Sequence, residues 1–264
     1  MRAVRPKKFL GQHFLKDLSV ARRIADTVDA CPSLPILEVG AGTGVLTQFL
    51  IEKGRELRVV EIDYESVAYL LRAFPSLEDG ILEDDFLSMR LDRTFGGRPF
   101  VVTGNYPYNI STQIFFHVLE YRQLVPCCTG MVQREVALRL SAKPSTKAYG
   151  ILTVLVGAWY DVEYLFTVDE GVFDPPPRVK SAVIRMTRNT VEELGCDETL
   201  FRTVVKTAFN QRRKTLRNAL KPLLASLGIT DCSFLPEETL LKRAEQLSIP
   251  QFVELTNLIY EASN

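Results

Sequence analysis

The sequence predicts an α/β protein with a mostly parallel sheet, followed by a smaller all-α domain. Short, almost uninterrupted apolar runs alternate with helix-length segments over roughly the first 188 residues, as in a parallel sheet covered on both faces. Beyond residue 190 or so, apolar residues recur at helical spacing and no strand pattern is evident. We therefore expect a doubly wound domain over residues 1–189 and a helical domain over residues 190–264.

Five apolar runs are the predicted strands of the sheet: Ile36–Val39, Leu57–Ile62, Phe100–Thr103, Thr129–Val132 and Ser181–Met186. The segments that predict helices between them are Val45–Lys53, Tyr64–Phe74 and Ser111–Tyr121. This βαβα order is the reason for expecting helices on both faces of one sheet.

The C-terminal part has a different pattern. Its first helix is predicted from apolar residues three or four positions apart, which are Phe201, Val204, Val205, Ala208, Phe209 and then Leu216, Leu220 and Leu223. A second helix is expected over Glu237–Leu247, after Pro236. Ser248 and Gln251 have the spacing of a capping box, which predicts a third helix ending near Tyr260.

Charge is balanced over the chain but is unevenly distributed. Among 264 residues, Lys+Arg and Asp+Glu both number 32, so net charge favours no partner. Two segments nevertheless carry several basic residues and no acidic one: Arg2, Arg5, Lys7, Lys8 and Lys16 in the first, and Arg202, Lys206, Arg212, Arg213, Lys214, Arg217 and Lys221 in the second. Such segments are either contacts for a polyanion or solvated faces.

Composition excludes several classes of protein. The five cysteines form no CxxC pair, which argues against a zinc motif and a disulfide framework, and only two histidines are present. The most apolar uncharged stretch, Ala148–Tyr160, is too short to cross a bilayer, and the N-terminus lacks the apolar core of a signal peptide. We expect a soluble cytoplasmic protein without a metal, and a monomer because no long exposed apolar stripe is evident.

A glycine-rich turn follows the first predicted strand. Gly40, Gly42 and Gly44 have the spacing G-x-G-x-G after the acidic Glu38, and Thr47 stands where a dinucleotide motif needs its third glycine. Glycines allow the backbone to approach a ligand closely. This spacing favours S-adenosylmethionine, whose amino-acid and ribose parts need no pyrophosphate cradle.

Two further acidic residues follow in the order expected of such a site. Glu61 ends the second strand, where a carboxylate can accept hydrogen bonds from both ribose hydroxyls. Asp85 follows the apolar pair Ile81 and Leu82 and is placed to accept a hydrogen bond from an adenine amino group. Each could singly be a loop acid, but the ordered set indicates a cofactor site.

The segment Gly104–Asn109, with the sequence Gly-Asn-Tyr-Pro-Tyr-Asn, follows the predicted strand Phe100–Thr103, at the carboxyl edge where ligands bind in open sheets. An exocyclic adenine amine is a poor nucleophile because its lone pair is delocalised into the ring. The side-chain oxygen of Asn105 and the carbonyl of Tyr106, held rigid by Pro107, can accept the protons of this amine. Tyr108 offers a flat face on which an extruded base can stack, worth about 1–3 kcal/mol.

Six segments of the chain resemble one known family. They are Lys8–Leu15, Glu38–Gly44, Gly104–Ser111, Met131–Ala137, Phe173–Ser181 and Phe209–Lys214. The chain is similar to the small-subunit (16S) ribosomal RNA adenine N6,N6-dimethyltransferase (KsgA) family from residue 7 to about 220, and only in helical character thereafter. The resemblance implies a class I, Rossmann-like S-adenosylmethionine-dependent methyltransferase sheet.

The resemblance also implies a reaction: four methyl transfers from S-adenosylmethionine that give N6,N6-dimethyladenosine at two adjacent adenosines near the 3′ end of 16S rRNA. The family's cofactor contacts correspond to His13, Leu15, Gly40, Glu61, Asp85 and Asn105, beside Gly42 of the glycine turn. Phe173 matches the aromatic residue that, with Tyr108, sandwiches the target base. His13 stands where many relatives carry Asn, and Tyr106 where many carry Leu.

The second basic segment gains a role from this resemblance. Arg212, Arg213, Lys214 and Arg217 are candidate phosphate contacts, which contribute affinity rather than base identity. Three other functions stay open: an adenine methyltransferase of large-subunit rRNA that confers antibiotic resistance, an assembly checkpoint that binds the small ribosomal subunit with little need for catalysis, and a nicotinamide-dependent oxidoreductase. The missing dinucleotide glycine argues against the last.

Overall fold

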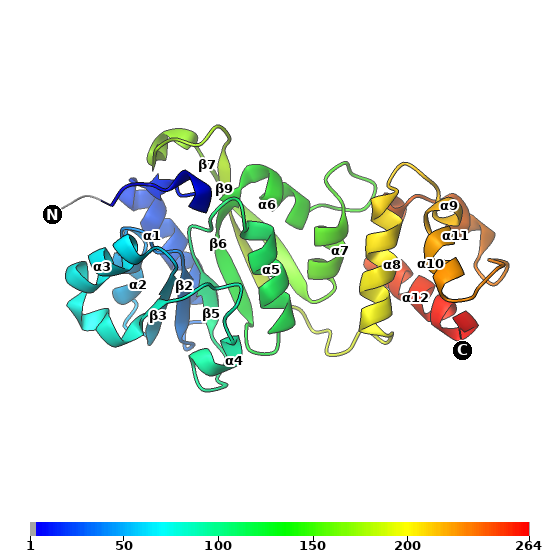
Figure 1. Cartoon of the computed structure of the whole chain (residues 1–264), viewed down its shortest axis with the longest axis horizontal. Coiled ribbons are helices and arrows are strands. Elements are labelled where there is room, and N and C mark those ends of the chain that lie inside the picture. Colours follow the sequence, from blue (N-terminus) through cyan, green and yellow to red (C-terminus); the bar gives the residue numbers. More distant parts are fainter. Residues whose placement is uncertain (1–3, 264) are drawn as a thin grey trace. The chain divides into compact units, whose positions relative to one another are not determined.

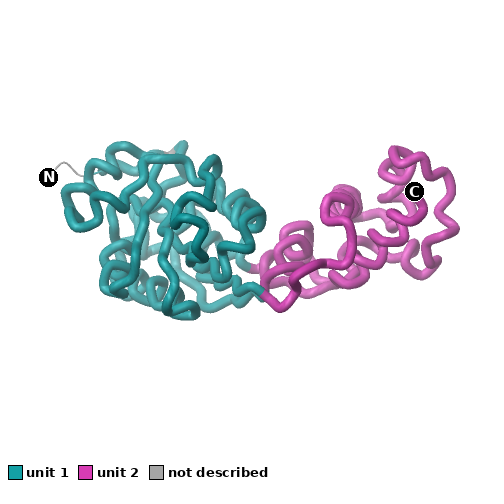
Figure 2. Tube along the Cα trace, turned by 90° about the horizontal axis from the view of Figure 1, so that it is seen from below, with its two compact units in different colours: residues 1–137, 161–188 teal, residues 138–160, 189–264 magenta. Residues whose placement is uncertain are grey.

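The computed structural model describes residues 4–263, so Arg2 of the first basic segment lies outside the described residues. The chain forms two compact units (Figure 2). The first contains residues up to 137 together with 161–188, and the second contains residues 138–160 and those from 189 onward. The segment 138–160 thus belongs to the second unit, whereas the predicted division places it in the first domain. Assignment of these parts to functional domains stays a prediction.

A seven-stranded sheet is the centre of the first unit (Figure 1). Its order is β4-β3-β2-β5-β6-β9-β7. The strands are β2 (Ile36–Val39), β3 (Leu57–Glu61), β4 (Ile81–Glu83), β5 (Val101–Thr103), β6 (Cys127–Gln133), β7 (Tyr160–Val168) and β9 (Ser181–Arg188). The five strands from β4 to β6 are parallel, and β9 is antiparallel to β6. The predicted mostly parallel α/β sheet is confirmed.

Helices cover both faces of this sheet, as the βαβα pattern predicts. Because side chains alternate along a strand, Ile36, Val59 and Val101 share one face, where they enter a hydrophobic core with α1, α2 and α3. Cys128 points to the other face, towards Tyr106, whose ring packs edge-on against Phe115 of α5. The helices of this unit are α1 (Leu18–Asp26), α2 (Thr47–Ile51), α3 (Tyr64–Ala73), α4 (Leu91–Thr94), α5 (Ser111–Glu120) and the start of α6 (Arg134–Leu140).

Strand β7 was not predicted from the sequence. It lies at the edge of the sheet, and its first residues alternate between apolar side chains and exposed acidic ones, Asp161 and Glu163. An edge strand has one solvated side, so it lacks the continuous apolar run by which the central strands are recognised. A separate two-stranded sheet pairs β1 (Phe14–Leu15) with β8 (Phe173–Asp174).

The second unit is helical. Its helices are α7 (Ile151–Gly157), α8 (Glu198–Asn210), α9 (Leu216–Ala219), α10 (Lys221–Ser226), α11 (Glu237–Leu241) and α12 (Ile249–Ser263). Both α7 and α12 contact α8, whose periodic apolar residues are buried as predicted. The capping box is confirmed, because the backbone N–H of Ser248 donates to Oε1 of Gln251 at 2.9 Å. Among residues 4–263, no helix has both the length and the apolar character to cross a membrane.

The predicted helix over Glu237–Leu247 is wrong in its second half. Helix α11 ends at Leu241, Lys242 is extended, and a 3-10 turn covers Ala244–Gln246. Residues 242 and 243 pair instead with the chain before α9: the N–H of Leu216 donates to the carbonyl of Lys242 at 2.8 Å. This long-range backbone pairing replaces the helical hydrogen bonds that the local pattern predicts.

The strand order creates one point where the chain reverses direction across the sheet. The chain runs from β2 outward to β3 and β4, and then returns to β5 on the other side of β2. Loops that leave the carboxyl ends of β2 and β5 therefore diverge, and open sheets bind ligands at such a point. The glycine turn after β2 and the segment Gly104–Asn109 after β5 are these two loops.

A buried acid stands on the central strand just before the glycine turn. Glu38 is 1% exposed, and its Oε2 accepts a hydrogen bond from Oγ1 of Thr47 at 2.7 Å. Burial raises its pKa from the ordinary 4.5 to about 8, and the nearby Glu61 adds to this while the Thr47 hydroxyl opposes it. The protein therefore holds a proton on Glu38 near neutral pH.

This raised pKa makes the stability of the protein pH-dependent. Above pH 4.5 the folded state retains on Glu38 a proton that the unfolded state releases. The protonated Glu38 therefore contributes fully to the free energy of unfolding below pH 4.5, and this contribution is lost as the pH rises towards about 8. The loss is up to about 1.4 kcal/mol per pH unit. Glu38→Gln, which resembles the protonated acid, should match the original protein near pH 4.5 and be more stable at pH 8.5. Urea unfolding of the cofactor-free protein at both pH values measures this difference.

Glu83→Gln on β4, in the same sheet, is the matched control, because Glu83 is exposed. Its free energy of unfolding should differ little from that of the original protein at either pH. If the free energy of unfolding of Glu38→Gln differed from that of the original protein by the same amount at both pH values, the proposed protonation of Glu38 would be contradicted.

Candidate active site

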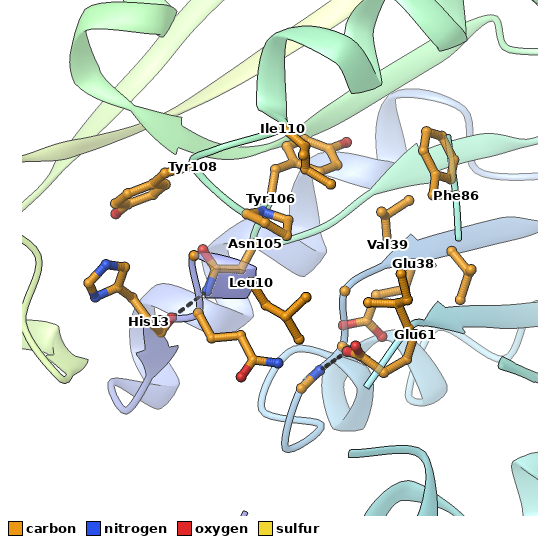
Figure 3. Close-up of a pocket in the computed structure, with 18 of the residues that line it drawn as sticks. Leu10, His13, Glu38, Val39, Glu61, Phe86, Asn105, Tyr106, Tyr108 and Ile110 are labelled. Atoms are coloured by element: carbon orange, nitrogen blue, oxygen red, sulfur yellow. Dashed lines mark hydrogen bonds between the residues drawn. The ribbon is translucent and has the colours of Figure 1, made fainter. Parts of the chain in front are cut away.

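A cleft lies at the point where the strand order reverses (Figure 3). It is lined by the glycine turn after β2, the carboxyl ends of β3 and β4, the loop after β5 and the N-terminal segment around residues 10–15. The structure brings together every residue predicted to bind the cofactor: His13, Leu15, Gly40, Gly42, Glu61, Asp85 and Asn105. Tyr106, Pro107 and Tyr108 line the same cleft.

The glycine turn is bonded to Glu61 at the end of β3. The N–H of Gly42 donates to Oε2 of Glu61 at 2.9 Å, and the N–H of Asp63 donates to Oε1 at 3.0 Å. Gly42 has a φ of +56°, and a side chain there would also meet the ring of Phe14. Burial raises the pKa of Glu61, whereas its backbone hydrogen bonds oppose that shift. A carboxylate has about four acceptor sites, so Glu61 can accept a further hydrogen bond from a ligand.

Asp85 and its neighbours form another wall of the cleft. Oδ1 of Asp85 accepts the N–H of Leu87 at 3.0 Å, which holds this half-buried carboxylate at the end of β4. Apolar side chains that the sequence reasoning missed stand beside the two acids, namely Ile62 next to Glu61 and Phe86 next to Asp85. An apolar residue directly after each strand-end acid was the signal that could have identified them.

Asn105 has a defined amide orientation. Its Nδ2 donates to the backbone carbonyl of His13 at 3.1 Å (Figure 3). Because a carbonyl can only accept, this bond identifies the nitrogen side of the amide and leaves Oδ1 free of it. The N-terminal segment therefore sets the orientation in which Asn105 presents an acceptor.

Tyr106 anchors the loop from below and is almost completely buried. Its hydroxyl donates to the carbonyl of Thr129 at 2.6 Å, and its N–H donates to the carbonyl of Met131 at 3.0 Å. Burial raises the pKa of this phenol well above its ordinary value. Its side chain is therefore a neutral anchor, and only its backbone carbonyl is free for the role predicted from the sequence.

The two aromatic residues predicted to sandwich a base have different environments. Tyr108 is half-buried in the wall of the cleft, and its hydroxyl is bonded to Oγ of Ser181. Phe173 is 1% exposed, belongs to the hydrophobic core and is not among the residues that line the cleft. The ring that does stack on Tyr108 is that of His13, with centroids 5.3 Å apart.

An ionic contact fastens the N-terminal segment beside the cleft. Nζ of Lys7 pairs with Oδ1 of Asp63, and Nε2 of Gln12 donates to Oδ2 of Asp63 at 3.3 Å. Burial alone would raise the pKa of Asp63, but these hydrogen bonds outweigh it and lower the pKa. Sequence reasoning missed Gln12 and Asp63, and it placed Lys7 only in a basic segment, because the partners are far apart along the chain.

The four predicted phosphate contacts lie in the second unit, just after α8, and fall into two pairs. Arg212 and Arg217 form ion pairs, with Oε2 of Glu245 at 2.7 Å from Nε of Arg212 and with Glu237 respectively. Arg213 and Lys214 are exposed, and their side chains have no hydrogen-bond or ion-pair partner in the described part of the chain. Among these four residues, Arg213 and Lys214 are therefore the two whose charges face solvent.

No group of three or more His, Cys, Asp or Glu side chains among the described residues could hold a metal ion. The acidic residues of the cleft are instead bonded to backbone N–H groups and hydroxyls. A site with this composition suits an organic ligand that carries hydroxyl, amino and aromatic groups.

Comparisons with known proteins agree with this geometry. The family model described as ribosomal RNA adenine dimethylase matches residues 3–260. A "Ribosomal RNA small subunit methyltransferase A" of Bacteroides thetaiotaomicron is 66% identical over 99% of this chain and 97% of its own. A protein of the same name from Porphyromonas gingivalis is 56% identical over 99% of this chain and all of its own.

Solved structures show the same fold. A dimethyladenosine transferase from Plasmodium falciparum has a TM-score of 0.76 at 21% identity, covering 95% of this chain and 98% of that one. The 23S rRNA methyltransferase ErmE has a TM-score of 0.64 at 25% identity, covering 91% of this chain and 99% of that one. Given the match over nearly its whole length, this chain belongs to the ribosomal RNA adenine dimethylase family.

Proposed function

We propose that this protein transfers methyl groups from S-adenosylmethionine to N6 of two adjacent adenosines in the 3′-terminal hairpin loop of small-subunit (16S) rRNA. The observation that carries the proposal is the oriented amide of Asn105, which presents an acceptor in a cleft at the reversal point of the sheet. High identity to proteins named for small-subunit methylation favours this substrate over large-subunit rRNA.

The residues of the cleft fit the cofactor. Glu61, held by two backbone N–H groups, has free lone pairs for the ribose hydroxyls, and Asp85 has them for the adenine amine. Ile62 and Phe86 provide apolar walls for the adenine ring. The turn at Gly40 and Gly42, together with His13 and Leu15, completes the set. S-Adenosylmethionine supplies an activated methyl group bonded to a cationic sulfur.

The chain's own contribution to the reaction is to prepare the amine. Oδ1 of Asn105 and the carbonyl of Tyr106, held before Pro107, accept the two N–H groups of the adenine amine. These bonds favour a pyramidal nitrogen and direct its lone pair into the cleft. The nitrogen becomes acidic once alkylated, and its proton leaves to water, so no side chain has to act as a general base.

Base binding and RNA binding are assigned to different parts of the chain. Tyr108 provides the stacking face for the extruded adenosine. Phe173 would have to leave the core to form the second face, so its predicted role has no support in its buried position.

Phosphates of the RNA are contacted by two residues of the helical C-terminal region, Arg213 and Lys214. Arg212 and Arg217 can contact a phosphate only after their ion pairs with Glu245 and Glu237 are broken. We further propose that the protein acts as a cytoplasmic monomer in small-subunit biogenesis.

The direct test is an incubation of the protein with radiolabelled S-adenosylmethionine and unmethylated small ribosomal subunits, with large subunits and naked rRNA in parallel. We expect label as N6,N6-dimethyladenosine near the 3′ end of small-subunit rRNA. Label on large-subunit RNA alone would indicate a methyltransferase of the antibiotic-resistance group. Tight binding to the small subunit without any label would indicate an assembly factor that does not depend on catalysis.

Loss of the Asn105 acceptor should abolish most of the turnover. For Asn105→Ala we expect at least about a 100-fold fall in kcat, the size of effect seen when one preorganised polar group of an active site is removed. Binding of S-adenosylmethionine, measured by calorimetry, should stay detectable because Glu61 and Asp85 are unchanged. Asn109→Ala is the matched control within the same loop, since Asn109 also lines the cleft but is exposed and donates a long bond of 3.4 Å to the carbonyl of Phe9. Normal turnover of Asn105→Ala would refute the assigned role.

Arg213 and Lys214 should account for part of the salt dependence of binding to the small subunit. Each phosphate contact to single-stranded RNA contributes about 0.7 to the slope of log K against log salt concentration. Replacing both Arg213 and Lys214 by Ala should therefore reduce that slope by about 1.4, as measured by filter binding over a range of salt concentrations. Lys221→Ala, an exposed basic residue of the same unit, should change it less. An unchanged slope in the double variant would mean that this pair contacts no phosphate.

A further inference from the structure

The imidazole of His13 occupies one face of the ring on which the target base is proposed to stack. The two ring centroids are 5.3 Å apart and the ring planes differ by 29°. Both residues line the cleft, and Figure 3 shows the two rings facing one another with Asn105 beside them. The amide of Asn105 is bonded to the backbone carbonyl of this same His13, so we take the face of Tyr108 that His13 covers to be the one next to the acceptor.

The two rings leave no room for a base between them. Carbon atoms in contact lie about 3.5–4 Å apart, so a flat ring inserted between two others needs about 7 Å between their planes. A stacked pair with centroids at 5.3 Å is already in contact. An adenine that stacks on this face of Tyr108 must therefore displace the imidazole.

Two contacts hold the imidazole side chain in the described part of the chain, a hydrogen bond and the ring stack. Its Nδ1 lies 2.8 Å from the carbonyl of Pro175, and because a carbonyl only accepts, Nδ1 is the protonated donor. The other contact is the stack itself. The bond that orients Asn105 uses the backbone carbonyl of His13, so the ring can rotate away about its side-chain bonds while the Asn105 amide stays in place.

We propose that the His13 imidazole covers the base-binding face of Tyr108 in the RNA-free enzyme and is displaced by the incoming adenine. His13 is then a positioning residue that determines how readily the base enters, and it takes no part in methyl transfer. The inference rests on the proposed function, because it assumes that an adenine stacks on Tyr108. Besides the place of His13 in the cofactor-binding set, it separates two duties of position 13 towards the substrate: the backbone orients Asn105, and the side chain competes with the base.

The test is the sign of the change in KM for small ribosomal subunits at saturating S-adenosylmethionine. His13→Asn and His13→Ala keep the backbone carbonyl but remove the ring, so no stack has to be broken. We expect KM for the subunit to fall about 3- to 10-fold in both variants. Calorimetry with S-adenosylmethionine measures separately any effect on the cofactor. A KM that rises or stays the same would overturn the proposal. A rise would mean that the imidazole supports Tyr108 on the face that the base does not use, and an unchanged KM would mean that the imidazole does not affect base binding.

A second variant distinguishes competition from a general structural effect. In a Tyr108→Leu background the aromatic face is absent, so adding His13→Asn should no longer lower KM. An equal fall in both backgrounds would show that the change at position 13 acts elsewhere, and would also overturn the proposal. These comparisons are read relative to the original protein's own transfer of label to small subunits, so an inactive original protein would refute the proposed function instead.

Nuclear magnetic resonance can observe the stack in the RNA-free protein. The chain has only two histidines, His13 and His117, so the His13 Hε1 signal is identified by its loss in His13→Asn. We expect the Tyr108 ring to shift this signal upfield, and Tyr108→Leu to return it towards the position of free histidine. A His13 signal that does not respond to Tyr108→Leu would remove the basis of the inference.

Discussion

The site depends on a close approach of two strands at their carboxyl ends. Gly104, just after β5, lies so near to β2 that a Cβ there would be 2.5 Å from the carbonyl oxygen of Val39. Only a residue without a side chain permits this contact. It brings the glycine turn that follows Val39 and the loop that contains Asn105 to opposite sides of one cleft, although more than sixty residues separate them in the sequence.

The loops at this point are held by buried polar contacts rather than by regular structure. Glu61 bonds the glycine turn, Tyr106 anchors the loop after β5 by its hydroxyl, and the carbonyl of His13 orients Asn105. Each contact joins elements that are distant in sequence. The acceptors of the site are thus in place before any ligand is bound, which is how a preorganised active site avoids reorganisation during the reaction.

Buried carboxyl groups affect the same cleft in two ways. Glu38 and Glu61 both have a raised pKa because they are removed from water, so Glu38 contributes little negative charge to the cleft near neutral pH. A cationic ligand would favour the ionised forms and so be bound more tightly as pH rises. Asp63 behaves oppositely because Lys7 and Gln12 stabilise its charge, and in doing so they fasten the N-terminal segment.

Local patterns in the sequence predict the fold class, the central strands and most of the polar residues that line the cleft, because glycine turns, strand-end acids and the Asn-Tyr-Pro-Tyr segment are recognisable without their surroundings. The contacts that each side chain makes depend on the folded arrangement. It buried Phe173, set the ring of His13 on Tyr108, and paired Arg212 and Arg217 with Glu245 and Glu237 while leaving Arg213 and Lys214 exposed. It also ended α11 early, because residues 242 and 243 pair with the chain before α9. In each case the partner is distant in sequence, and local spacing holds no information about a distant partner.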